Sequence, residues 1–213
     1  MKPAMKKIKF LFFLAGLTTS FIRPANAAFE SKFPPVGSKT LANCGVMKKE
    51  IFYKKVSSSN KEVTIKVTTG QKKYERTVVK LPWMFVTDIY VTQTENGKVR
   101  KSNKVISGNL DKLISLELGK VYKGVVQETG PSQKPFKWNY VIKILKKKKV
   151  KTKNFGSVDV LEIEENRVTP HQYHSKLITY YAPSLSENLY WNYSDNRKFN
   201  QTCIVETIEK PKH

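Results

Sequence analysis

The stretch Trp-Asn-Tyr-Val-Ile-Lys-Ile, residues 138–144, places large apolar side chains at every second position. Residues 63–67, Val-Thr-Ile-Lys-Val, repeat this pattern. Alternation with a period of two is typical of a β-strand with one buried and one solvated face. Both stretches therefore predict strands of an antiparallel sheet, whose wet face carries the intervening Lys, Thr and Asn side chains.

Short strand-like runs continue along the chain, with turn residues between them. They lie at residues 74–80, 83–94, 113–118, 121–128, 158–163, 177–182, 189–193 and 202–208. Asn96-Gly97 predicts a tight hairpin, and Asn109 is the expected N-cap of a short helix around residues 109–115. No long segment has a helical period. The predicted fold is mainly β, a single-domain curved antiparallel sheet or half-open barrel.

Residues 1–27 have the features of a secretory signal peptide. A lysine-rich start precedes an apolar segment at residues 10–17, and Ala25-Asn26-Ala27 is a small-x-small cleavage site. The apolar segment is shorter than the roughly 20 residues that a membrane-spanning helix needs. We therefore expect a periplasmic or secreted protein whose mature chain has no transmembrane span. Residues 28–43 are expected to form an extended lead-in, and residues 44–213 a single β-rich domain.

The chain is strongly basic, with 39 Lys and Arg against 17 Asp and Glu and a formal net charge of +22. Cleavage of the leader removes five basic residues and leaves a net charge of about +17. Such a surface attracts anionic envelope components such as lipopolysaccharide, acidic lipid or cell-wall polymers. Codon bias toward lysine is the alternative explanation. Nucleic acid is not an expected partner, because the protein is exported and its aromatic residues lie far from its densest lysine run.

Two cysteines, Cys44 and Cys203, lie near the two ends of the mature chain. An even cysteine count in an exported protein indicates a disulfide bond. This bond would join the N-terminal segment to the last strand and contribute about 5 kcal/mol in loop-entropy models. The alternative is a nucleophilic thiol, although neither cysteine has a histidine nearby in the sequence.

The densest charge run lies between two predicted strands, and its cations are candidates for anion binding. They are Lys146, Lys147, Lys148, Lys149, Lys151 and Lys153. The functional interpretation is contact with phosphate or carboxylate groups. The alternative is a solvated hairpin end whose lysines discourage edge-to-edge aggregation.

Catalytic and metal-binding signals are weak. His171 and His174 are three residues apart and are the only metal-ligand candidates, but a zinc site needs further ligands in a defined geometry. The chain contains no G-x-S-x-G nucleophile elbow and no glycine-rich phosphate loop. We therefore predict no catalytic residue, no metal and no cofactor.

Three segments of the second half resemble elements of a broad group of uncharacterised β-rich periplasmic proteins of Gram-negative bacteria. Residues 116–122 are similar to PL-x-x-G-x-x-W, and residues 150–160 to V-x-T-x-x-G-T-F-x-V. Residues 178–185, Ile-Thr-Tyr-Tyr-Ala-Pro-Ser-Leu, are similar to T-x-W-Y-A-P-E-L-G, with Tyr180 in place of Trp and Ser184 in place of the acid. The resemblance covers residues 113–193. It implies a curved antiparallel sheet and no established catalytic residues.

Together these features predict an exported, non-enzymatic binding or envelope-maintenance protein. Its basic surface would meet an anionic envelope component or a protein partner. A secreted effector or inhibitor that acts on a host protein is one alternative. A hydrolase with a dispersed active site is another.

Overall fold

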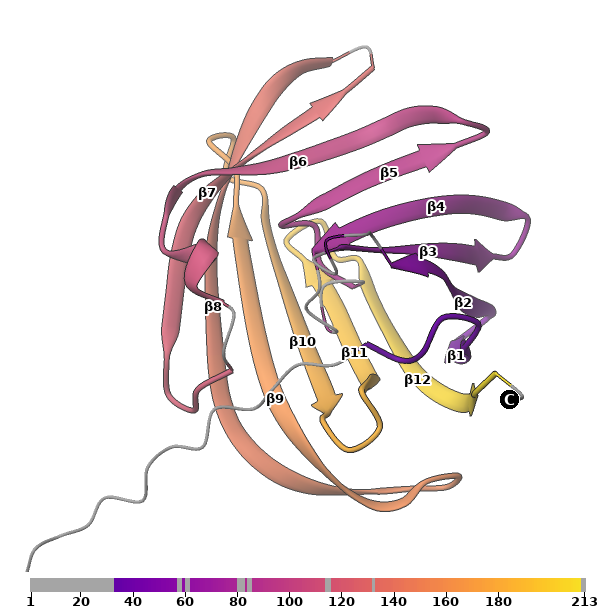
Figure 1. Cartoon of the computed structure of the whole chain (residues 1–213). Coiled ribbons are helices and arrows are strands. Elements are labelled where there is room, and N and C mark those ends of the chain that lie inside the picture. The colour runs from indigo at the N-terminus through magenta and orange to yellow at the C-terminus, as the bar shows by residue number, and fades with distance from the viewer. Residues whose placement is uncertain are drawn as a thin grey trace, which may run out of the picture.

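The protein is described by a computed structural model that covers residues 33–56, 59, 62–79, 83, 86–113, 116–131 and 133–211. The signal peptide predicted at residues 1–27 lies outside this range. The described residues form twelve β-strands and the short 3₁₀ helix η2 (Figure 1). The elements are β1 (Lys39–Cys44), β2 (Met47–Val56), β3 (Glu62–Thr69), β4 (Lys72–Val79), β5 (Val91–Glu95), β6 (Lys98–Gly108), η2 (Leu110–Lys112), β7 (Val121–Gly130), β8 (Gln133–Thr152), β9 (Gly156–Val168), β10 (His174–Ala182), β11 (Glu187–Asp195) and β12 (Asn200–Glu209).

The sheet closes on itself. Each strand pairs antiparallel with the next one, and β1 pairs with both β2 and β12, which produces a closed barrel. The prediction of an all-β antiparallel fold is confirmed, whereas a half-open barrel is wrong. Closure depends on β1, which begins within residues 28–43, the segment predicted to be an extended lead-in. From Lys39 onward these residues are extended and pair as the closing strand of the barrel.

The β5–β6 hairpin is built around Asn96-Gly97, as predicted. Both residues have positive φ, 51° and 73°, which the two central positions of a type I′ turn require. The strand predicted at residues 83–94 begins later than expected, since β5 runs from Val91 to Glu95. Of the preceding connection, Trp83, Thr87 and Ile89 are completely buried. The described residues of this β4–β5 connection thus contribute side chains to the core of the barrel.

Alternate side chains of the strands form the core. In β3 the buried residues are Val63, Ile65 and Val67, and in β8 they include Tyr140, Ile142 and Ile144. Two strands extend past the ring: β8 has 20 residues and β9 has 13. Their distal halves curl beneath the ends of β10, β11 and β12 (Figure 1). We call residues 146–160, the distal half of this hairpin, the β8–β9 arm.

Candidate functional site

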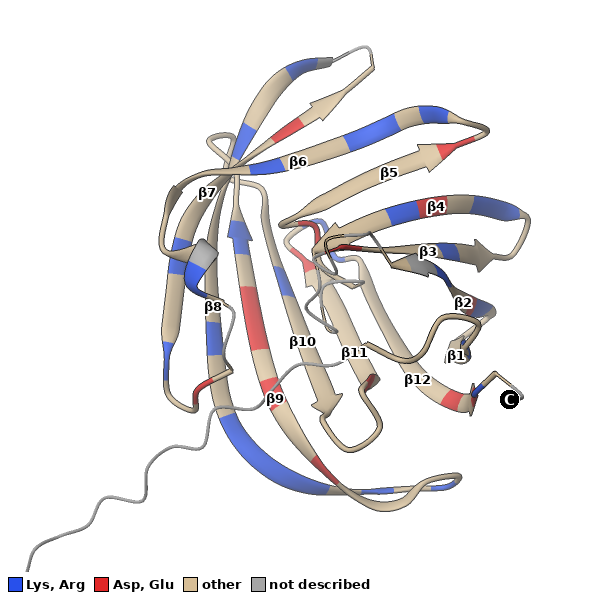
Figure 2. Ribbon diagram, in the orientation of Figure 1, with Lys and Arg blue, Asp and Glu red and all other residues tan. Residues whose placement is uncertain are grey.

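The predicted lysine run lies on the β8–β9 arm (Figure 2). A register shift between Ile144 and Lys146 marks the point where β8 changes its pairing with β9. Beyond it, alternate positions face opposite sides. Val158 and Val160 are buried, while Lys149 and Lys151 are exposed. The arm therefore has an apolar side that packs against the barrel and a basic side in solvent.

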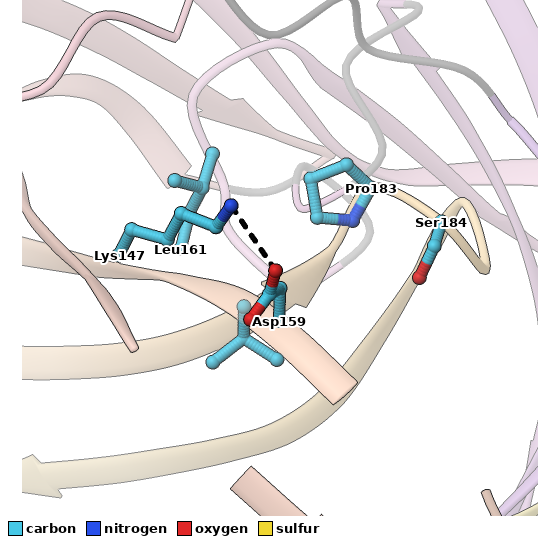
Figure 3. A pocket seen from close by; sticks show the side chains of 6 residues that line it. Lys147, Asp159, Leu161, Pro183 and Ser184 are labelled. Carbon is cyan, nitrogen blue, oxygen red and sulfur yellow. Dashed lines mark ion pairs between the residues drawn. The ribbon is translucent and has the colours of Figure 1, made fainter. Parts of the chain in front are cut away.

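Three of the six predicted lysines have acidic partners on β9. Lys146 and Lys148 lie 4.0 Å and 2.7 Å from Oε2 of Glu162. Nζ of Lys148 also lies 3.5 Å from the ring centre of Tyr180. Nζ of Lys147 lies 3.1 Å from Oδ2 of Asp159, beside the small hollow of about 200 Å³ that Figure 3 shows. These three positive charges are partly neutralised.

The other three lysines, Lys149, Lys151 and Lys153, have no ion pair within 4.0 Å among the residues that the structure describes. All three are exposed. The pKa of Glu206 is lowered mainly by the hydrogen bond from Asn43, and the charge of Lys153 contributes to the same shift. The lysine run therefore has two parts. Lys146, Lys147 and Lys148 form an ion-paired base, and Lys149, Lys151 and Lys153 form a tip without an ion pair among the described residues.

A groove of about 920 Å³ lies between the tip of the arm and the outward face of the barrel. Asn154 holds the tip in place, because its Nδ2 donates to the carbonyl oxygen of Glu206 in β12, 2.5 Å away. Lys151 and Lys153 line the arm side of the groove, and Tyr190 and Ile204 line the barrel side. Since Cys203 and Val205 point into the core, the intervening Ile204 points outward, and it is 55% exposed.

A second charged cluster, which the sequence did not reveal, lies in the lumen. Asp88 of the β4–β5 connection accepts from three cations on three different strands. Its carboxylate oxygens lie 2.6 Å from Nζ of Lys101, 2.9 Å from Nη1 of Arg167 and 3.2 Å from Nη2 of Arg76. Arg76 also donates to the carbonyl oxygen of Thr87. The cluster therefore fixes the connection inside the barrel.

The charged groups in the lumen strongly shift one another's pKa values. Burial alone would raise the pKa of Asp88, but Lys101, Arg167 and Arg76 hold it well below its usual range. Burial raises the pKa of Glu165 to about 7, against the opposing charge of Arg167. The two guanidinium side chains are each 6% exposed, whereas the side chains of Lys101 and Asp88 are 22% and 24% exposed. The geometry of the cluster indicates a structural role.

Glu187 is another buried carboxylate of the barrel interior. Its Oε2 accepts from Oγ1 of Thr40 at 2.5 Å and from the hydroxyl of Tyr53 at 3.0 Å. Burial raises its pKa to about 7, although these two donors oppose the shift. The three side chains connect β11 to β1 and β2 across the seam at which the barrel closes.

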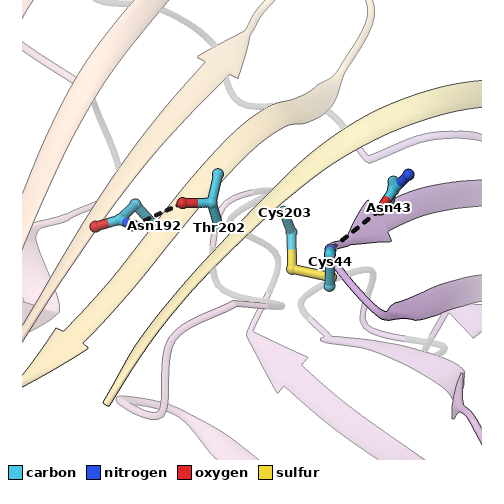
Figure 4. The surroundings of a disulfide bond; sticks show 6 residues. Asn43, Cys44, Asn192, Thr202 and Cys203 are labelled. Carbon is cyan, nitrogen blue, oxygen red and sulfur yellow. Dashed lines mark hydrogen bonds between the residues drawn. A yellow bond between two sulfur atoms is a disulfide. The ribbon is translucent and has the colours of Figure 1, made fainter. Parts of the chain in front are cut away.

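The predicted cysteine pair lies at this seam (Figure 4). Cys44 of β1 and Cys203 of β12 are joined by a disulfide with an S–S distance of 1.96 Å, and both side chains are buried. Oδ1 of Asn43 accepts from the amide of Gly45 in the adjoining β1–β2 turn. A thiol nucleophile is incompatible with this bonded pair.

The two candidate metal ligands do not converge with other ligands. His171 lies in the β9–β10 turn, His174 begins β10, and both are exposed. Within the described ranges, no three His, Cys, Asp or Glu side chains are grouped so that they could hold a metal ion. The same residues include no helix of the length and apolarity needed to cross a membrane.

Comparison with known proteins finds solved structures that resemble this chain, but no match to a family model or to a curated protein. One similar structure is a candidate exported protein with a YmcC-like fold from Bacteroides fragilis, 12% identical, with a TM-score of 0.47 over 86% of this chain and 100% of that one. A candidate lipoprotein from Parabacteroides distasonis is 8% identical, with a TM-score of 0.41 over 83% and 97% of the two chains. The hypothetical lipoprotein YmcC from Escherichia coli is 7% identical, with a TM-score of 0.42 over 83% and 88%. All three TM-scores are below 0.5, so none of these likenesses carries an argument about function.

Proposed function

We propose that the chain is an exported, non-enzymatic binding protein whose β8–β9 arm holds an anionic component of the cell envelope. The observation that carries this proposal is the unpaired tip of the arm. Lys149, Lys151 and Lys153 are exposed and lack a carboxylate partner among the described residues, whereas Lys147 and Lys148 nearer the barrel are paired. Cations without an internal partner are available to an external anion.

The charge of the whole molecule supports the same proposal. A formal net charge of +22, or about +17 after cleavage of the leader, gives a long-range field that concentrates anions near the protein. The arm presents part of this charge on a hairpin that extends past the ring of strands (Figure 2). The signal-peptide features of residues 1–27 support a location where envelope anions occur.

The test is binding of mature chain 28–213, with its disulfide formed, to vesicles of phosphatidylglycerol and phosphatidylcholine. Each lysine near an anionic surface contributes about 1 kcal/mol, so Lys151→Gln with Lys153→Gln should weaken binding by at least about tenfold. The matched control is Lys104→Gln with Lys123→Gln. These two exposed lysines lie on β6 and β7, outside the arm, and their removal changes the net charge equally.

Two results would contradict the proposal. Equal losses in both double variants would mean that net charge alone attracts the vesicles. Absence of any binding to vesicles and to a soluble polyanion, at low salt, would favour the alternatives of an effector acting on a host protein or a hydrolase.

A further inference from the structure

The groove under the β8–β9 arm combines an apolar floor with a basic edge. On the floor, Tyr180 and Tyr190 stack with ring centres 4.5 Å apart and planes inclined by 24°. Ile204 of β12 lines the same groove with 55% of its surface exposed, and Val150 lines it from the arm. Exposure of an isoleucine side chain to water is unfavourable, so an apolar ligand group that covered it would be stabilised by the hydrophobic effect.

The basic edge of the same groove is formed by Lys151 and Lys153. One carboxylate, Glu206, also lines the groove, but it already has partners. Its Oε1 accepts from Nδ2 of Asn43 at 3.1 Å, and its Oε2 lies 3.5 Å from Nζ of Lys48. The local balance of charge therefore favours an anion at the edge.

We propose that this groove binds a single membrane-derived lipid, with its acyl chain on the tyrosine and isoleucine floor and its phosphate between Lys151 and Lys153. This inference rests on the proposed function and names the class of its ligand. A soluble polyanion would use the lysines and leave the apolar floor empty. The groove volume of about 920 Å³ falls within the roughly 300–1,000 Å³ of pockets that hold small molecules.

The arm itself defines the length of the site. Asn154 bridges to Glu206 at one end, and Lys148 contacts the ring of Tyr180 nearer the base of the arm. An acyl chain between these two contacts would lie along the outward face of β10, β11 and β12, beneath the arm.

The experiment measures binding of monomeric dodecyl phosphate, below its critical micelle concentration, to oxidised chain 28–213 by calorimetry. Glycerol 3-phosphate provides the headgroup alone, and dodecyl maltoside provides the chain without the charge. Each buried methylene contributes about fourfold in affinity. Dodecyl phosphate should therefore bind at least about tenfold more tightly than glycerol 3-phosphate, even if only a few methylenes are covered.

Ile204→Glu should reduce binding of dodecyl phosphate by at least about tenfold, since it places a charge on the floor of the groove. Ile106→Glu is the matched control, because Ile106 is 41% exposed on β6, outside the groove. Both positions are solvent-exposed, and circular dichroism verifies that each variant is folded. Lys151→Gln with Lys153→Gln should also weaken dodecyl phosphate binding, and should leave any dodecyl maltoside binding unchanged.

Equal affinity for dodecyl phosphate and glycerol 3-phosphate would overturn the lipid inference and leave the proposed anion binding intact. Unchanged affinity in Ile204→Glu would overturn it as well, as would dodecyl maltoside binding as tightly as dodecyl phosphate. Failure of the vesicle experiment together with failure of all three small probes would reject both the inference and the proposed function.

Discussion

The lumen of the barrel and the β8–β9 arm both gather charged side chains, but only the lumen balances them within a closed cluster. In the lumen, Asp88 contacts three cations, and the side chains of Arg76 and Arg167 are almost completely removed from water. At the tip of the arm, Lys149 and Lys151 are exposed and have no acidic partner among the described residues. Charge that is paired and buried specifies the position of a chain segment, whereas charge that is unpaired and exposed remains available to a ligand.

The largest expected effect comes from breaking the lumen cluster. Asp88→Ala should lower the free energy of unfolding by about 3–5 kcal/mol, because it removes the anion shared by two buried guanidinium groups and by the partly exposed Lys101. The contrasting change is Asp159→Ala on the arm, which breaks a pair whose side chains are 48% and 47% exposed. That loss should stay below about 1 kcal/mol. Urea denaturation measures both, and similar values for the two variants would remove the distinction between the regions.

The disulfide at the seam should have the next largest effect. Replacing both cysteines, Cys44→Ala with Cys203→Ala, should reduce the free energy of unfolding by about 2–5 kcal/mol, since the bond closes a long loop. Its sequence separation is 159 residues. The arm joins the same strand β12 through Asn154 and Glu206. Lipid binding by the folded double variant should therefore stay within about twofold of the oxidised protein. A much larger loss would show that the seam positions the arm.

The pH dependence of stability should come from buried acids of the barrel interior. In the folded protein Glu187 has a pKa of about 7, compared with an ordinary value of 4.5, so the folded state holds the proton more tightly. The contribution of protonated Glu187 to the free energy of unfolding is fully present below about pH 4.5 and is lost as the pH rises through 7. The loss approaches about 3 kcal/mol.

Glu187→Gln tests this linkage, because glutamine has nearly the same shape and cannot ionise. In this variant the free energy of unfolding, measured between pH 5 and 8, should depend less on pH. The remaining dependence should come from Glu165, whose pKa is also raised to about 7. Thr40→Val removes a donor that favours the ionised form and should move the transition to higher pH. An unchanged pH profile in Glu187→Gln would contradict the assignment.

The sequence predicted those parts of the molecule that depend on local pattern. Alternation identified strands such as β3, and Asn96-Gly97 identified a turn that requires two positive φ angles. Strand β1 was missed because its inward side chains, Thr40, Ala42 and Cys44, are small or polar and give no apolar alternation. Without that strand, the pattern could not show that the barrel closes.

The two charged regions differ in the same way. The lysine run could be found because its members are adjacent in the sequence. Asp88 and Arg167 are 79 positions apart and meet only because the β4–β5 connection enters the lumen. No short-range spacing indicates such a contact. Which lysines of the arm are ion-paired also depends on the register of β8 against β9. Asp159 lies directly across from Lys149, but its carboxylate is ion-paired with Lys147.

The smallest expected effect concerns the arm tip itself. Lys149→Gln with Lys151→Gln should change the free energy of unfolding by less than about 0.5 kcal/mol, because neither cation has an internal partner to lose. Removing two like charges from a molecule of net charge +22 reduces self-repulsion, so a slight stabilisation is expected. Urea denaturation at low salt would measure it. A loss above about 1 kcal/mol would mean that these lysines hold the arm on the barrel, as Asp88 holds the connection in the lumen, and that the tip is not reserved for a ligand.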